Sequence, residues 1–141
     1  MSRSVTIRDA DHAIALLEAQ VNALGADYVY PPSVSGTGTC RYFDQAAEEC
    51  DPDGRPLLKA GCIVGHVLIA LGFEPDVAGY SGDPIEDNNA SGLVDDGTIM
   101  APAIVGHILT AAQTAQDAGQ TWGDALTTAR QARLDWEAED A

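Results

Sequence analysis

Ala60–Ala70 reads AGCIVGHVLIA and Ala101–Ala111 reads APAIVGHILTA, two stretches that align without a gap and share the string Ile-Val-Gly-His. Glycine inside a helix costs about 1 kcal/mol relative to alanine, so its presence at both Gly65 and Gly106 indicates a close backbone approach. We therefore expect two similar central helices that pack together, with Gly65 facing Gly106. Apolar residues of both helices should form much of the surrounding core: Ile63, Val64, Val67, Leu68, Ile104, Val105, Ile108 and Leu109.

The chain on either side of this pair also has helical periodicity. The expected helices span about residues 8–24, 57–71 and 100–118, with a last one from Thr121 onward. Thr6 and Asp9 resemble a capping arrangement at the start of the first helix, and Gly25 stands where a left-handed stop is common.

Short β-prone runs lie between the first two of these helices. Tyr28–Tyr30 and Thr39–Phe43 are rich in aromatic and β-branched residues, and they predict a small hairpin. Residues 51–54, Asp-Pro-Asp-Gly, have the composition of a turn. The sequence therefore predicts a mainly α fold of the α+β type, with about four helices and a minor β-hairpin.

Length and charge limit the classes of function. A chain of 141 residues has the usual size of one domain, so residues 1–141 should share one core. There are 22 acidic and 7 basic residues, the formal charge is −15, and no Lys or Arg lies between Ala60 and Ala129. Such a surface repels phosphates, so DNA, RNA and anionic membranes are not expected partners. A basic protein or a cation is electrostatically favoured.

The sequence carries no signal for a membrane or for secretion. No apolar run reaches the roughly 18 residues needed to span a bilayer, and the first residues lack the apolar stretch of a signal peptide. We therefore expect a cytoplasmic protein in which Cys40, Cys50 and Cys62 are reduced thiols that pack as small hydrophobes. The oligomeric state is open, and a homodimer is one alternative.

A flexible acidic loop is expected at about residues 79–97, where Gly, Pro, Asn and Asp are frequent. With the residues before it, this loop should contribute to a partner-binding surface. The acidic residues of that surface are Glu74, Asp76, Asp83, Glu86, Asp87, Asp95 and Asp96. Asp87, Asn89, Ser91 and Asp95 also have the spacing of an EF-hand calcium loop, but Thr98 replaces its final glutamate. We favour a solvated loop over a calcium site.

The cysteines and histidines allow two kinds of chemistry. Cys40, Cys50, Cys62 and His66 supply the ligand types of a Cys₃His zinc site, but they lack the short paired spacing of zinc ribbons. Cys62 stands near a helix N-terminus, which can lower the pKa of a thiol, and His66 or His107 could serve as its base. We favour structural roles, with reduced cysteines in the core, half-buried histidines, and neither a metal nor another cofactor. The alternative is a ligand or pH-sensitive site formed by both histidines.

Several segments resemble a group of small uncharacterised proteins of actinobacteria and their phages. They are Asp-Gly-Arg-Pro at residues 53–56, Gly-Cys-Ile-Val-Gly-His at residues 61–66, and Gln-Asp-Ala-Gly-Gln-Thr-Trp-Gly-Asp-Ala-Leu at residues 116–126. The group has no assigned activity that could be carried over. The resemblance implies a phage origin, and such genes often encode accessory proteins that bind a host component.

We therefore expect a non-enzymatic, acidic accessory protein that binds a basic host protein in the host cytoplasm. One alternative is an enzyme or zinc-binding protein that uses Cys62, His66 and His107. Another is a protein that sequesters a small molecule between the two matching helices.

Overall fold

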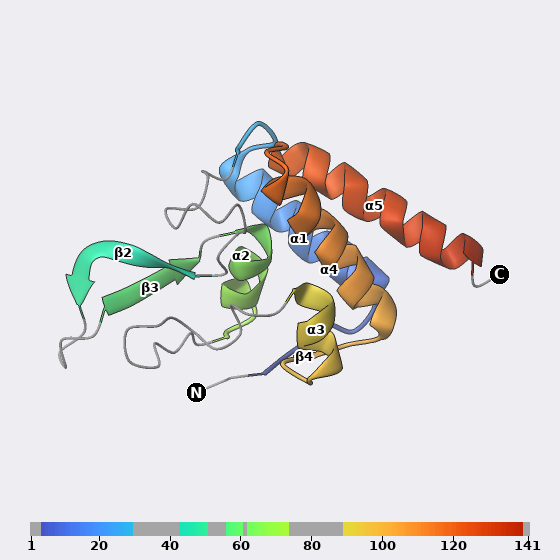
Figure 1. Cartoon of the computed structure of the whole chain (residues 1–141), viewed down its shortest axis with the longest axis horizontal. Helices are drawn as coiled ribbons and strands as arrows, with labels where there is room; N and C mark the ends of the chain where they lie inside the picture. Colours follow the sequence, from blue (N-terminus) through green and yellow to red (C-terminus); the bar gives the residue numbers. More distant parts are fainter. Residues whose placement is uncertain (1–3, 30–42, 51–55, 61, 74–88, 140–141) are drawn as a thin grey trace.

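The computed structural model describes residues 4–29, 43–50, 56–60, 62–73 and 89–139 (Figure 1). Its elements, in chain order, are β1 (Val5–Thr6), α1 (Ala10–Leu24), β2 (Phe43–Cys50), β3 (Pro56–Ala60), α2 (Ile63–Ala70), α3 (Ala90–Asp95), β4 (Ile99–Met100), α4 (Ala103–Asp117) and α5 (Trp122–Glu139). The described part of the chain is mainly helical, as the sequence predicts.

The strands form two small pairs. β1 runs parallel to β4, with Val5 opposite Ile99, and the N–H of Val5 donates to the carbonyl of Thr98 at 2.9 Å. This pair ties the segment before α1 to the segment before α4. β2 and β3 form the second pair, which is antiparallel.

The core lies where α1, α4 and α5 pack against one another, with α2 and α3 added on α4 (Figure 1). Trp122, at the start of α5, and Leu17 of α1 are fully buried. The predicted core of the two matching helices is confirmed, since all of its residues are buried except Ile104, which packs against the core while partly exposed.

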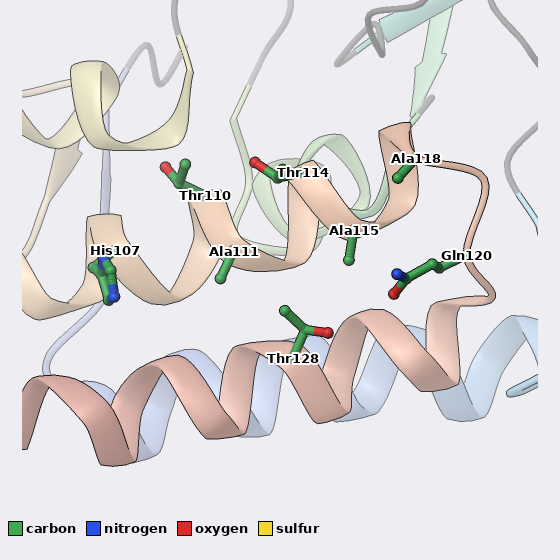
Figure 2. A pocket seen from close by; sticks show the side chains of 8 residues that line it. All are labelled: His107, Thr110, Ala111, Thr114, Ala115, Ala118, Gln120 and Thr128. Atoms are coloured by element: carbon green, nitrogen blue, oxygen red, sulfur yellow. The ribbon is translucent and has the colours of Figure 1, made fainter.

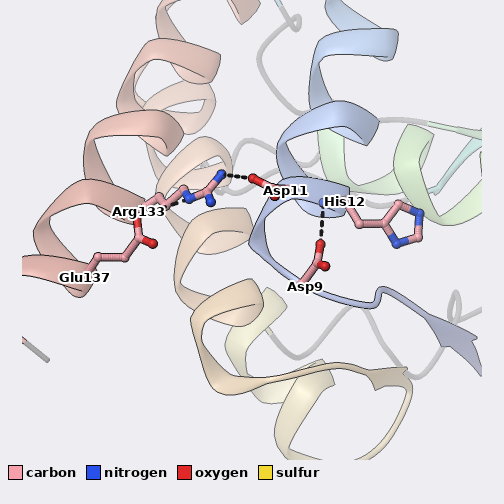
Figure 3. Close-up of polar contacts among 5 residues, drawn as sticks. All are labelled: Asp9, Asp11, His12, Arg133 and Glu137. Atoms are coloured by element: carbon pink, nitrogen blue, oxygen red, sulfur yellow. Dashed lines mark hydrogen bonds and ion pairs between the residues drawn. The ribbon is translucent and has the colours of Figure 1, made fainter.

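The helices around the central pair begin and end close to their predicted positions. Asp9 is the N-cap of α1 and accepts the N–H of His12 at 2.8 Å (Figure 3), while Gly25 ends the helix with a φ of 100°. Thr6 lies in β1 and takes no part in this cap. At the start of α5, the Oγ1 of Thr121 accepts the N–H of Asp124 at 3.1 Å.

The antiparallel strands lie later in the chain than the sequence indicates. Tyr28 belongs to no strand, because its carbonyl accepts the N–H of Trp122 at 2.8 Å and its ring packs edge-on against the indole. Residues 30–42, which contain most of the predicted hairpin, lie outside the described part. The predicted helix at 57–71 is also wrong over its first four residues, because Pro56–Ala60 is a strand that pairs with β2.

The acidic segment at 79–97 contains an element of regular structure. Asn89 caps α3 by accepting the N–H of Gly92 at 2.8 Å, so Ala90–Asp95 is a helix. The hydroxyl of Ser91 lies 3.0 Å from that of Thr110 on α4. A helix here is incompatible with the EF-hand loop considered above, and it corrects the prediction of a loop for residues 90–95. Residues 79–88 lie outside the described part.

The prediction that Gly106 packs closely against Gly65 is wrong, because Gly106 packs against α3. A Cβ built on Gly106 would lie 3.1 Å from the Cα of Ser91 and 3.2 Å from Cγ2 of Val94, so the close approach is to α3. Both glycines are buried, and α2 does pack against α4. The N-terminus of α2, however, meets the C-terminal part of α4, where Gln116 accepts the N–H of Ile63.

Candidate functional site

The two histidines of the matching helices lie at opposite ends of α5. The ring of His66 packs edge-on against Trp122, with centroids 5.1 Å apart, and the ring of His107 lies 5.2 Å from that of Trp136. Fourteen residues of one helix separate the two tryptophans, a distance of about 21 Å at 1.5 Å per residue. One site that contains both histidines therefore does not form, which corrects the shared ligand or catalytic site considered from the sequence.

Cys62 is fully buried at the N-cap of α2 and makes no capping hydrogen bond with its side chain. The first N–H of the helix, that of Ile63, donates to the Oε1 of Gln116 at 2.8 Å instead. Reactive cysteines are at least partly exposed, so a fully buried thiol favours the packing role.

The four candidate zinc ligands lie partly inside and partly outside the described part of the chain. Cys40 and the side chain of Cys50 lie outside the described part, so a zinc site that joins them to Cys62 and His66 stays the alternative that it was from the sequence. Among the residues that are described, no group of three or more His, Cys, Asp and Glu is placed to hold a metal ion.

The acidic side chains face solvent. Two acidic residues of the predicted partner surface are exposed, Asp95 as the last residue of α3 and Asp96 as its C-cap. The others lie outside the described part: Glu74, Asp76, Asp83, Glu86 and Asp87. Every acidic residue whose side chain is described is exposed.

A groove of about 390 Å³ lies on the hairpin formed by α4 and α5 (Figure 2). Its lining residues are His107, Thr110, Ala111, Thr114, Ala115, Ala118, Gln120 and Thr128. Thr128 points from α5 toward α4, and Gln120 stands at the end where α4 leads to α5 (Figure 2). Most of the surface that these residues present to the groove is apolar, and His107 is the one titratable side chain among them.

Among the residues that line the groove, the groups able to take part in acid–base or nucleophilic chemistry are His107 and the hydroxyls of the threonines. The hydroxyl of Thr110 accepts the N–H of Ser91 at 3.0 Å and lies beside the Ser91 hydroxyl, so it is engaged with α3. His107 packs on Trp136 at one end of the groove, with no second titratable side chain in the lining to act with it.

Sequence reasoning missed this groove, although a signal for it is present. His107, Ala111, Ala115 and Ala118 recur at spacings of four, four and three, so they follow one side of α4. Alanines at such spacing usually indicate helix packing, and only the position of α5 shows that this side of α4 is open to solvent.

The charges are distributed unequally around the α4–α5 hairpin. Arg130 and Arg133 of α5 face α1, where Arg130 pairs with Glu18 at 2.5 Å. Arg133 pairs with Asp11 of α1 at 2.6 Å, as Figure 3 shows. The hydrogen bond with Asp11 raises the pKa of Arg133. Asp124 is exposed and precedes Thr128 of the groove by four residues, so the two residues are neighbours on one face of α5. No Lys or Arg is among the residues that line the groove.

The fold and the groove define a small, mainly helical and strongly acidic domain. No protein-family model, no curated protein and no solved structure matches this chain. Within the described ranges, no helix combines the length and the apolar composition needed to cross a membrane.

Proposed function

We propose that this protein is a non-enzymatic accessory protein, encoded by a phage, that binds a basic protein of its bacterial host in the host cytoplasm. The observation that carries the proposal is the exposure of every described acidic side chain on a chain with a formal charge of −15. Complementary charge between two proteins increases their rate of association and disfavours the binding of partners with the wrong charge. The resemblance to small actinobacterial and phage proteins supports the proposed origin.

The placement of the candidate catalytic groups supports binding over catalysis. Cys62 is fully buried, and His107 is separated from His66 by the length of α5 between their two tryptophan partners. Asp95 and Asp96 are exposed at the C-terminal end of α3, and the proposed contact surface includes them together with the acidic residues from Glu74 onward.

The test is affinity capture from lysate of an actinobacterial host, with the immobilised protein eluted by a salt gradient. We expect retention of a basic protein that elutes as salt rises, because exposed charges are screened beyond about 10 Å at 0.1 M salt. The retained protein is then purified, and its binding is measured again with the two components alone. Retention of nothing, or of proteins whose binding ignores salt, would contradict the proposal. A hydrolase activity that Cys62→Ala abolishes would establish the enzyme instead.

A further inference from the structure

The α4–α5 hairpin has two sides that a further helix could cover, and one of them is already covered. α1 packs against both α4 and α5, and it lies behind α5 in the view of the groove (Figure 2). The groove at Thr114 and Thr128 lies on the other side of the hairpin. Antiparallel helices in bundles commonly accept a neighbour on each side, because their rows of side chains form ridges and grooves.

The shape of the groove suits a helix. The lining residues of α4 run from His107 to Ala118, a length of about 16 Å or three helical turns. Ala111, Ala115 and Ala118 have short side chains, and short side chains at a contact permit the closer interaxial distances found between helices. An elongated, shallow and mostly apolar groove can therefore receive the apolar stripe of an amphipathic helix.

The charges around the groove determine the chemistry of that helix. Asp117 follows Thr114 by three residues, Asp124 precedes Thr128 by four, and Asp135 follows Thr128 by seven, so each lies near the groove on its own helix. All three carboxylates are exposed. Arg130 and Arg133, in contrast, pair with α1 on the opposite side of α5. A second copy of this chain would bring the same negative charge, so complementarity favours a basic partner.

We propose that the α4–α5 groove binds a basic amphipathic helix of the partner protein, so that this helix packs beside α4 and α5 on the side opposite α1. The inference rests on the proposed function and specifies the partner's contact segment. That segment has an apolar stripe with Lys and Arg on both of its flanks. The apolar stripe enters between Thr114 and Thr128, and the flanking cations meet Asp117, Asp124 and Asp135.

The test measures binding of a designed, fluorescently labelled helical peptide of roughly 18 residues, with Leu and Ala on one face and Lys and Arg on its flanks. Fluorescence anisotropy is recorded for the full chain and for two variants, Thr114→Trp and Thr127→Trp. Thr114 lines the groove, whereas Thr127 is exposed on α5 outside it, and its hydroxyl donates to the carbonyl of Gly123. The second variant is therefore a matched control for adding an exposed indole to a helix.

We expect Thr114→Trp to weaken peptide binding by about tenfold or more, because the indole blocks the centre of the contact. Thr127→Trp should leave the affinity within about twofold of the unmodified protein, because this exposed site lies outside the contact. A peptide with Glu in place of Lys and Arg should not bind. Thermal melts followed by circular dichroism establish that both variants are folded.

Four results would overturn the inference. If all three proteins bind the basic peptide equally, the groove is not the contact site, although a basic partner can still be captured from lysate by other acidic residues. If no protein binds it, or if the Glu peptide binds as well, the groove does not recognise a basic helix. If the unmodified protein is a dimer that Thr114→Trp dissociates in sedimentation experiments, the occupant is a second copy. Salt-dependent capture of a basic protein decides the proposed function separately.

Discussion

Gln116 of α4 should be essential to stability, because it joins three helices through one buried oxygen atom. Its Oε1 accepts the N–H of Ile63, the first residue of α2, at 2.8 Å and the indole N–H of Trp122, the first residue of α5, at 3.1 Å. Only 2% of the residue is exposed. Since the Cys62 side chain provides no cap, Gln116 performs that role for α2 from a distant part of the chain.

Gln116→Met preserves the approximate length of the side chain but removes the acceptor from both donors. Leaving a buried donor unsatisfied costs about 1–3 kcal/mol, so the two donors together give a loss of about 2–6 kcal/mol. The apolar Met should offset roughly 1 kcal/mol of this by its burial. Domains of this kind have a free energy of unfolding of about 5–15 kcal/mol, so the variant should be strongly destabilised.

The measurement is urea unfolding, followed by the fluorescence of Trp122 and Trp136 and by circular dichroism. Gln131→Met is the matched control, because Gln131 is exposed on α5 and should change stability by less than about 0.5 kcal/mol. Trp122→Phe removes one of the two donors, so the loss caused by Gln116→Met should be smaller in that background. A loss below about 1 kcal/mol for Gln116→Met, or strict additivity of the two changes, would refute the capping role.

Three further outcomes are expected. Gly123→Ala should destabilise the fold by about 1–3 kcal/mol, measured by thermal or urea unfolding. The reason is that the new Cβ would lie 2.9 Å from both the Cβ and the carbonyl oxygen of Ala26. A variant as stable as the unmodified protein would contradict this packing. Gly106→Leu should cost a similar amount through its contact with Ser91 and Val94 of α3, and a neutral effect would show that α3 yields easily. Polarisation titrations with duplex DNA and RNA at physiological salt should show no binding, and micromolar affinity with a steep salt slope would contradict the electrostatic reasoning.

Local signals in the sequence were sufficient for the helices at either end of the chain. Asp9, Gly25 and Thr121 cap or end their helices in the predicted places, because capping depends on neighbouring residues alone. The run from Leu57 onward is ambiguous in the sequence, because a short apolar run has no periodicity that separates a buried strand from a helix. Its first part pairs with β2, and such pairing is set by residues distant in the sequence.

The candidate site was harder to predict, since it depends on how helices pack. The match between the two Ile-Val-Gly-His strings correctly indicated two buried helices, yet Gly106 approaches Ser91 and not its counterpart Gly65. Equal sequence around two glycines therefore does not specify which neighbour each one meets. The groove is lined mainly by alanines and threonines, which have no distinctive chemistry, and it can be recognised only once the position of α5 beside α4 is known.

The most direct test of a groove that binds a basic helix is a map of amide chemical shifts in the ¹⁵N-labelled protein during titration with the basic helical peptide. The largest changes should fall on His107–Ala118 and around Thr128, with smaller changes near Asp124 and Asp135, while the α1 residues that pair with Arg130 and Arg133 should change little. Changes concentrated on α1 or around Cys62 and His66, with none in the groove, would contradict the proposed site.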